Sequence, residues 1–498
     1  MTTTTVPPDI VHGQNDAVGR RRWRTASFWR LVALVLAFVI VAVAHLAPAM
    51  PGLKPQAQTI LGVFVWFVIV LAAEALPQIL IGVAAPLLVF LLNGTPVPQA
   101  FNAFSSDVFF LIMSAFVLVA VMMGTGLGKR LALGIVASVR STKATRIMAA
   151  MMGAGTALHS ILPTVSETAL FLPISRCLSE LHDGEEMPPR LKRANQAMIL
   201  TVTGLVPLFA GVFFLTAGVP NLILAGLLEK SSNIKISWVD WLVYNLPLWG
   251  LIPILYFLVK WWFKIGDVEL PNAVTVIPKV RADLGPIKRG EVWTLVCIAV
   301  GFTLWVTEPL TGISTGMAAL IMIVLLFMPW SGLRFADYSG QVMWPLLFLI
   351  AGAISMGNLL FGSGAVTWLA QFLVAPIQSS GIRSDILILL ILALALHVAR
   401  AGILSGGAMA AVFVPLIIGM AQELGFNVLP FSLVLTNALN FAVFVPISAV
   451  AILIAVQAAE LKWKEMVIFG SIVSVVANVY LILVQPQWMA LLGHPLRG

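Results

Sequence analysis

Charge, cysteine and histidine are all scarce in this chain. Only 10% of its 498 residues are charged, and it contains two cysteines and six histidines. Because Cys177 and Cys297 both lie in or beside apolar segments, no disulfide framework is expected. The sequence has no paired acid and base, no nucleophile motif and no metal-ligand spacing, so we expect no enzyme, no metal and no cofactor.

Hydrophobic residues dominate instead. They make up 60% of the chain and form apolar runs that suit helices crossing roughly 30 Å of hydrocarbon with about 20 residues each. The sequence therefore predicts an all-α polytopic membrane protein, with about 11 transmembrane helices and two re-entrant helical hairpins. The predicted spans are residues 29–47, 60–73, 79–92, 108–139, 194–228, 238–263, 292–306, 317–328, 342–377, 429–459 and 466–484, and the predicted hairpins are 144–178 and 386–424. The span 108–139 is expected to break near Gly124-Thr125-Gly126.

Basic residues are distributed unevenly between these spans. If residues 1–28 form a disordered basic tail in the cytoplasm, most of the 29 Lys and Arg residues fall in cytoplasmic segments. This bias is the positive-inside rule, so we expect a plasma (inner) membrane protein with a cytoplasmic N-terminus. The same bias explains the net charge of +8 without a nucleic-acid partner. Residues 264–290 then form a cytoplasmic linker, and residues 487–498 a short C-terminal tail.

The segments on either side of the linker repeat one another. EALP at 74–77 recurs as EPL at 308–310, GTGL at 124–127 as GSGA at 362–365, and FLPI at 171–174 as FVPL at 413–416. Residues 29–263 hold the first span and one repeat, and residues 291–486 hold the other. Each repeat has an odd number of spans, so the second copy is expected to run inverted in the membrane. Inverted repeats of this kind enclose a binding site near the midplane.

Both predicted hairpins carry polar residues at membrane depth. Such residues persist only where protein or a water-filled cavity satisfies them, which indicates a substrate or ion pathway. A hairpin tip also presents the partial positive charge of a helix N-terminus, so two tips facing one cavity would form an anion site. The alternative is that the small residues at the tips pack helices closely.

Arg400 is the Lys or Arg residue that this layout leaves in the hydrocarbon, where a charge costs at least about 3 kcal/mol. Its guanidinium would bind a carboxylate or sulfonate with two hydrogen bonds, or replace the charge of a sodium ion. The alternative is a structural arginine paired with a carbonyl.

The other ionisable and amide groups leave alternatives open. Glu167 is a proton carrier, a partner of Arg400 or a carboxylate in a wet vestibule, and His159 and His397 are proton relays or helix–helix hydrogen-bonding groups. Asn437 and Asn440 share one helix face. They bind the ligand if that face meets a hairpin tip, and otherwise they form hydrogen bonds between helices.

Several of these elements together resemble the divalent anion/sodium symporter family of the wider ion-transporter superfamily. The likeness covers about residues 29 to 485 and rests on EALP at 74–77, TGLGKRLAL at 125–133, the proline-ended hairpins and GVPNLI at 218–223. The resemblance implies a homodimer with a scaffold domain and a transport domain that moves as an elevator. That family has Ser-Asn-Thr at each tip, whereas this chain has Pro163-Thr164-Val165 and Ser405-Gly406-Gly407. The coupling ion is therefore left open between proton, counter-anion and sodium.

The residues and the resemblance together predict a secondary active transporter of a small anion. A di- or tricarboxylate is the first expectation, and a sulfate- or sulfonate-like anion is next; the alternative is a cation/proton antiporter or metalloid efflux carrier of the same superfamily. The candidate substrate-binding residues are Pro163, Thr164, Val165, Ser166, Thr168, Arg400, Gly402, Ser405, Gly406, Gly407, Asn437 and Ser448. The candidate coupling-ion or proton residues are His159, Glu167, Thr203, Gly204, Pro220, Asn221 and His397.

Overall fold

The computed structural model describes residues 16–139, 141–177, 187–266, 268–270, 273–400 and 406–497, without the side chains of 16–27, 177, 273–277 and 447. Within these ranges the regular structure is helical, apart from one isolated bridge between Lys143 and Glu269. Eight helical segments are long and apolar enough to cross a membrane, and three shorter helices are also apolar. The chain is therefore an all-α membrane protein, as its composition predicts.

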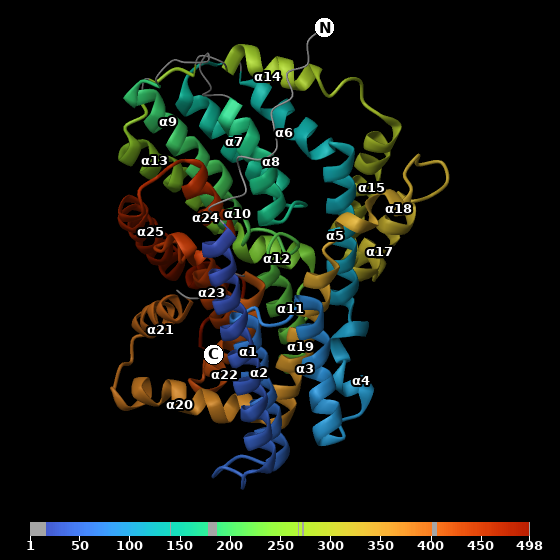
Figure 1. Cartoon of the computed structure of the whole chain (residues 1–498), viewed down its shortest axis with the longest axis vertical. Coiled ribbons are helices and arrows are strands. Elements are labelled where there is room, and N and C mark those ends of the chain that lie inside the picture. Colours follow the sequence, from blue (N-terminus) through green and yellow to red (C-terminus); the bar gives the residue numbers. More distant parts are fainter. Residues whose placement is uncertain are drawn as a thin grey trace.

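The first part of the chain forms fourteen α-helices (Figure 1). They are α1 (Asp16–Leu46), α2 (Pro55–Ala72), α3 (Gln78–Asn93), α4 (Val97–Ala100), α5 (Asp107–Thr125), α6 (Leu127–Ser138), α7 (Ala144–Leu158), α8 (Thr164–Cys177), α9 (Pro189–Ile199), α10 (Val206–Ala210), α11 (Val219–Ser232), α12 (Trp238–Asn245), α13 (Leu251–Phe263) and α14 (Ala273–Ala282). Short 3₁₀ segments η1 (Asn102–Ser105) and η3 (Leu246–Gly250) join some of them, and η2 (Leu200–Leu205) is a π-helix.

The second part of the chain forms the remaining helices. They are α15 (Arg289–Val306), α16 (Glu308–Thr311), α17 (Thr315–Leu326), α18 (Phe335–Tyr338), α19 (Trp344–Ser363), α20 (Ala365–Ser379), α21 (Asp385–Arg400), α22 (Gly406–Glu423), α23 (Val428–Asn440), α24 (Val450–Ala458) and α25 (Trp463–Leu491), with 3₁₀ segments η4 (Ser339–Gln341) and η5 (Pro446–Ser448). The tip of the second predicted hairpin, residues 401–405, lies outside the described residues.

Two long predicted spans break at glycine. The hydroxyl of Ser106 accepts a hydrogen bond from the Phe109 amide and begins α5, and α5 ends where the sequence predicts a break, because Gly126 adopts a φ of +82°. Gly364, at a φ of +80°, ends α19 in the same way. The prediction of one span over 342–377 is therefore wrong in detail, because Gly364 divides it into α19 and α20. Only glycine takes this left-handed conformation without strain.

Two further predicted spans are also interrupted. The span 194–228 unwinds between α10 and α11, and the span 429–459 unwinds between α23 and α24. Pro220 and Pro446 lie at the second and first positions of the segments that follow, where a missing amide hydrogen costs no helical hydrogen bond. Both unwound segments consist largely of apolar residues, so hydropathy continues through them and does not reveal the breaks.

The close crossing of α3 and α19 brings the two parts of the chain together. A Cβ on Gly82 would lie 2.2 Å from the Phe348 carbonyl oxygen, and one on Gly352 would lie 2.0 Å from the Gly82 carbonyl oxygen. No side chain fits at either position, so the backbones of the two helices are in direct contact, as small residues allow in membrane helices.

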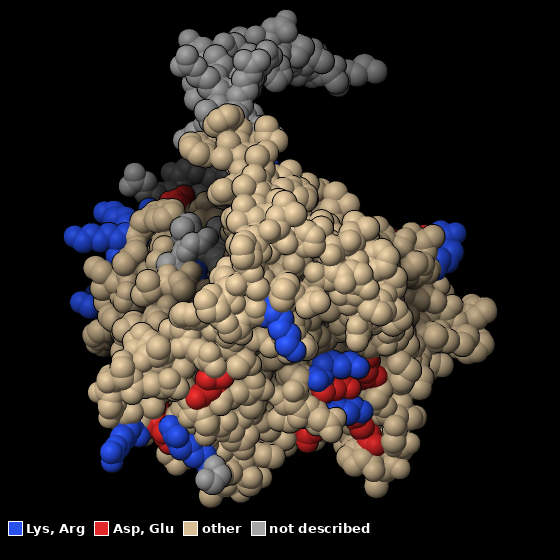
Figure 2. Space-filling view, turned by 90° about the horizontal axis from the view of Figure 1, so that it is seen from below, with Lys and Arg blue, Asp and Glu red and all other residues tan. Residues whose placement is uncertain are grey.

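Many charged residues at the surface of the molecule form ion pairs. In Figure 1, α6, α7, α9 and α14 lie at the upper end, and the α1–α2 turn and α20 lie at the lower end. Figure 2 views the lower end, where Lys and Arg are scattered and several lie beside Asp or Glu. Outside the first hairpin, the ion pairs of the described residues join residues that the sequence places on one side of the membrane, such as Arg30–Glu74 at 3.6 Å, Arg130–Glu291 at 3.2 Å and Arg497–Asp385 at 2.8 Å. This pairing agrees with the alternating order of the predicted spans.

Candidate functional site

Helices α7 and α8 form a helical hairpin whose turn contains the first set of candidate residues. Pro163 precedes Thr164, the first residue of α8, and the Glu167 amide donates to the Pro163 carbonyl. The Thr168 hydroxyl lies between the carbonyl oxygens of Thr164 and Thr203, at 2.9 and 2.8 Å. Ser166 is partly exposed on the first turn of α8, and Val165 is exposed. This first tip therefore offers the amides and hydroxyls of a helix N-terminus.

A buried acid–base pair lies directly behind this tip. Nδ1 of His159 contacts Oε2 of Glu167, and both side chains are fully buried. A Cβ on Gly155 would lie 2.3 Å from Oε1 of Glu167, so glycine makes room for the carboxylate. Nε2 of His159 and Oε1 of Glu167 have no hydrogen-bond partner among the described residues. Because both side chains are buried, each depends on the other for its hydrogen bond among the described residues.

The unwound segment between α10 and α11 supports the first tip. The Thr216 hydroxyl donates to the Ser160 carbonyl at 2.8 Å. The Asn221 amide donates to the carbonyls of Gly211 and Phe214 at 2.7 and 2.8 Å, and its Oδ1 has no partner within the described chain. Asn221 therefore holds the carbonyls that a regular helix would have paired internally, while Pro220 starts the next helix.

Arg400 is the last residue of α21 and is only 2% exposed. Its Nη2 donates to the Ser448 carbonyl at 3.0 Å, but its Nε and Nη1 have no partner among the described residues. The Ser448 hydroxyl beside it has none either. No carboxylate pairs with this guanidinium in the described part of the chain, so its charge and most of its donors are uncompensated.

The second tip continues from Arg400 into α22. Gly406, the first residue of α22, has open space around the position of a Cβ, and Gly407 is buried. Gly402 and Ser405 lie outside the described residues. Because Arg400 contacts Ser448 in η5, this hairpin meets the unwound segment between α23 and α24, just as the first hairpin meets the segment between α10 and α11.

The two unwound segments also meet each other. The rings of Phe209 and Phe441, at the starts of the two breaks, have centroids 4.8 Å apart. The π-helix η2 packs against α24, with Gly204 so close that a Cβ would lie 2.8 Å from that of Ala455. Thr203, beside it, donates to the Ile199 carbonyl at 2.6 Å. The structure thus brings elements of both hairpins and both breaks into one region of the molecule, although the sequence separates them by more than 200 residues.

Three candidate residues make hydrogen bonds between or within helices. His397 contacts the Ala393 carbonyl through Nδ1 at 2.6 Å and the Asn478 amide through Nε2 at 3.0 Å, so both ring nitrogens have partners. The Asn437 amide donates to Oδ1 of Asn245 and Oε1 of Gln485, at 2.7 and 3.1 Å. Asn440 donates to the Thr436 carbonyl of its own helix at 3.4 Å. These contacts favour the interhelical interpretation over the ligand interpretation for His397 and Asn437.

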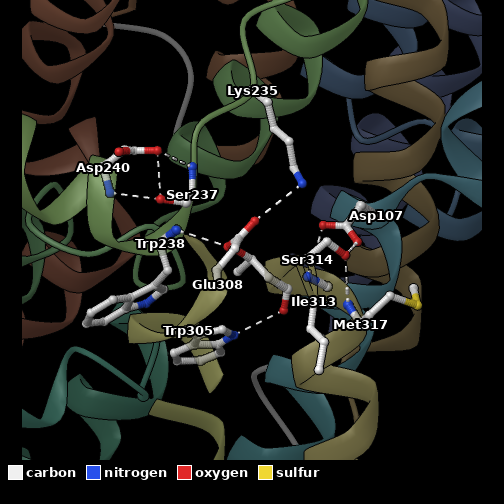
Figure 3. Close-up of polar contacts among 12 residues, drawn as sticks. Asp107, Lys235, Ser237, Trp238, Asp240, Trp305, Glu308, Ile313, Ser314 and Met317 are labelled. Atoms are coloured by element: carbon white, nitrogen blue, oxygen red, sulfur yellow. Dashed lines mark hydrogen bonds and ion pairs between the residues drawn. The ribbon is translucent and has the colours of Figure 1, made fainter. Parts of the chain in front are cut away.

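The sequence interpretation missed a second polar cluster, shown in Figure 3. Glu308 binds Lys235 at 3.3 Å and accepts a hydrogen bond from Thr315 at 2.6 Å. Asp107 accepts hydrogen bonds from the Ser314 hydroxyl and from the Gly316 amide, the latter at 2.9 Å. This cluster ties α5, the α11–α12 loop and α17 together, which indicates a structural role for Glu308. The sequence shows Asp107 and Glu308 each at the start of a helix, but it does not show which residues these two acids contact.

The comparisons with known proteins agree with this architecture. A family model described as the sodium:sulfate symporter transmembrane region matches residues 25–494. The sodium-dependent dicarboxylate transporter SdcS of Staphylococcus saprophyticus is 23% identical over 480 residues, covering 91% of this chain and 90% of that relative. The L-tartrate/succinate antiporter of Shigella sonnei is 25% identical over 382 residues, covering 71% of this chain and 76% of the relative.

A solved structure shows the same fold. The Alcanivorax borkumensis YdaH transporter matches with a TM-score of 0.54 at 15% identity, covering 95% of this chain and 100% of that chain. With the family match, this makes the chain a multi-pass membrane transporter of anions rather than an enzyme. Because the family model covers nearly the whole chain, the protein belongs to the sodium:sulfate symporter family, the divalent anion/sodium symporters that its motifs resemble.

Proposed function

We propose that this protein is a secondary active transporter of a small di- or tricarboxylate, which binds between Arg400 and the two hairpin tips. The observation that carries the proposal is the buried guanidinium of Arg400, whose Nε and Nη1 have no partner among the described residues. Burying such a charge costs at least about 3 kcal/mol, and a carboxylate held by two hydrogen bonds would offset that cost.

The remaining candidate residues surround this charge in the proposed site. The N-terminus of α8 supplies the amides of its first turn, including that of Val165, and the partly exposed hydroxyl of Ser166 for one end of the anion. Pro163 begins this turn, while the hydroxyls of Thr164 and Thr168 donate to the carbonyls of Pro207 and Thr203 and hold the tip in place. Gly406 leaves space for a ligand to approach the start of α22, Gly407 is the next residue of the same turn, and the Ser448 hydroxyl lies beside Arg400 without a partner among the described residues. We propose Gly402 and Ser405 as part of the same tip, and Asn437 as a residue that holds the helices around it.

The names of the relatives favour carboxylates over sulfate-like anions. One is named for dicarboxylates and another for tartrate and succinate. A sulfate- or sulfonate-like anion is the second candidate, because a guanidinium and helix N-termini also suit it. The cation/proton antiporter is disfavoured, since a buried guanidinium without an acidic partner among the described residues would repel a cationic substrate.

A ligand screen tests the substrate class. Purified protein should gain thermal stability from succinate, malate, tartrate or citrate, because a ligand that binds only the folded state stabilises it by mass action. At 100 times Kd the gain is about 2.7 kcal/mol of unfolding free energy. Monocarboxylates of equal ionic strength serve as the control. Stabilisation by sulfate or taurine alone would replace the carboxylate proposal with the oxyanion or sulfonate one.

We further propose an elevator mechanism in a homodimer of the plasma (inner) membrane, with the N-terminus in the cytoplasm. The hairpin α7–α8 packs against η2, α10 and α24, while α22 packs against α23 and α11, so each hairpin contacts broken helices. Such a unit is suited to move as one body. In this proposal the two hairpins open toward opposite sides of the membrane.

Cysteine labelling tests that movement. In a background without Cys177 and Cys297, cysteines at Ser166 and Gly406 should change their labelling rates in opposite directions when saturating substrate is added on one side. Ser166 is partly exposed and Gly406 has open space, so both positions accept the change. Equal and state-independent labelling at both positions would indicate a channel instead.

The coupling ion is proposed to be a proton, with a counter-anion as the alternative. Sodium needs several oxygen ligands, and Pro163, Val165, Gly406 and Gly407 carry no side-chain oxygen. The buried pair of His159 and Glu167, directly behind the first tip, offers a proton-binding site in place of a sodium site. Thr203, Gly204, Pro220 and Asn221 shape the backbone around this pair, and His397 plays a supporting role between helices.

A further inference from the structure

A basic pocket lies at the end of the molecule that carries α9 and α14, away from the proposed substrate site. It has a volume of about 680 Å³ and is lined by Arg190, Lys260, Lys264, Phe257, Trp261 and the backbone near Gly266. Arg190 begins α9, and the other side chains come from the end of α13. The positive-inside rule predicts that this end is cytoplasmic.

Helix α13 presents two stripes to this pocket. Its buried face contains Leu255 and Val259, so Lys260 lies on the opposite side, and Lys264 directly follows the end of the helix in a left-handed conformation. Phe257 and Trp261 are also four residues apart and are 63% and 64% exposed. A helix that ends with exposed aromatic rings beside lysines is typical of the boundary between hydrocarbon and headgroups.

The cations of this pocket have no acidic partner among the described residues. Nearby, Arg193 pairs with Glu465 at 2.5 Å, and Lys192 lies 3.7 Å from Glu460. By contrast, Arg190, Lys260 and Lys264 form no ion pair among the described residues, and the described residues of the pocket lining include no acid. Three cations around one cavity attract an anion.

We propose that this pocket binds the headgroup of an anionic phospholipid from the cytoplasmic leaflet. Arg190, Lys260 and Lys264 contact the phosphate, while the acyl chains lie along Phe257 and Trp261. A soluble phosphate would use the cations but not the exposed rings, which is why we assign a lipid. Basic pockets between membrane helices on the cytoplasmic side are suited to such headgroups.

The bound lipid would fix α9 against α13. Helix α9 leads directly into η2, which packs on α8 and α24, so the lipid joins the lipid-facing helix α13 to the elements around the first tip. The lipid proposal is tested independently of the anion proposal, because lipid binding is measured without any transport substrate.

Reconstitution with defined lipids tests this site. In nanodiscs, phosphatidylglycerol should raise the melting temperature of the parent protein relative to phosphatidylcholine, and native mass spectrometry should detect retained phosphatidylglycerol. The R190Q/K260Q/K264Q variant should lose at least tenfold in lipid occupancy and lose the thermal gain. The K279Q/R281Q/K462Q variant removes three exposed basic residues from the same end and should behave as the parent.

A second variant separates lipid binding from simple charge effects. F257A/W261A keeps all three cations, so it should retain binding of glycerol phosphate but show reduced occupancy by phosphatidylglycerol. Both variants are first checked in phosphatidylcholine for a single species in size-exclusion chromatography. If soluble glycerol phosphate stabilises the parent as much as the lipid does, or if all variants respond equally to phosphatidylglycerol, the lipid proposal is wrong.

Discussion

Replacing Arg400 with glutamine should reduce anion transport at least about 100-fold, because it removes the buried charge proposed to bind the substrate. Hydrogen bonds to a charged group contribute about 1.5–3 kcal/mol each, and 1.4 kcal/mol corresponds to a factor of ten. Two such bonds from Nε and Nη1 therefore account for a loss of this size. Uptake of radiolabelled succinate or malate into proteoliposomes measures it.

The same substitution should leave the fold intact. Within the described chain the Arg400 guanidinium makes one hydrogen bond, to the Ser448 carbonyl, and its loss is offset because the cost of burying the charge disappears. The melting temperature should stay equal or rise in the absence of substrate, while stabilisation by carboxylates should be lost. Lysine should restore transport only in part, since a point charge lacks the planar pair of donors.

A matched control comes from the same side of the molecule. Arg383 lies exposed between α20 and α21, and R383Q should transport at the parent rate. If R400Q also transports at the parent rate but melts at a lower temperature, Arg400 is structural and the substrate site lies elsewhere.

The sequence predicts the membrane class of the fold because hydropathy is a local property. Apolar runs are read directly, and the break at Gly126 follows from a residue type that ends helices. The breaks between α10 and α11 and between α23 and α24 were missed for the opposite reason. They are apolar, and they persist because Asn221 and Ser474 satisfy their backbone groups from elsewhere in the fold.

Long-range pairing limits what the sequence can predict about the site. Arg400 stands out as a charge in an apolar run, but its free donors are visible only after the chain has folded. Asn437 looks like a ligand until Asn245 and Gln485 are placed beside it, 192 and 48 residues away along the chain. A lone amide in a predicted span therefore indicates burial and hydrogen bonding, but not which group it binds.

The buried pair of His159 and Glu167 is expected to make uptake depend on the proton gradient. In the parent protein, uptake should rise when the outside is more acidic than the inside, because the proposed symport carries a proton on this pair. If one proton is required, the rate falls about tenfold per pH unit on the alkaline side of the ionisation. Replacing sodium with choline at equal ionic strength should change the rate little.

Glu167→Gln should uncouple transport from protons. The glutamine keeps the shape of the side chain but cannot ionise, so the pH dependence of uptake should become flat and substrate-driven acidification, followed with an internal pH dye, should disappear. Counterflow of labelled substrate should remain, since no net proton movement is needed. His159→Asn should flatten the same profile, because the pair forms no other hydrogen bond or ion pair among the described residues.

Glu423→Gln, on a partly buried glutamate at the end of α22, is the matched control and should keep the parent profile. Three results would oppose proton coupling. A steep sodium dependence in the parent would mean that backbone carbonyls at the tips supply the missing sodium ligands. Uptake driven only by an internal carboxylate, with no pH response, would favour counter-anion exchange. Retention of the parent pH profile in E167Q would place the titrating group outside the pair, because the variant has no carboxylate buried against Gly155 and His159.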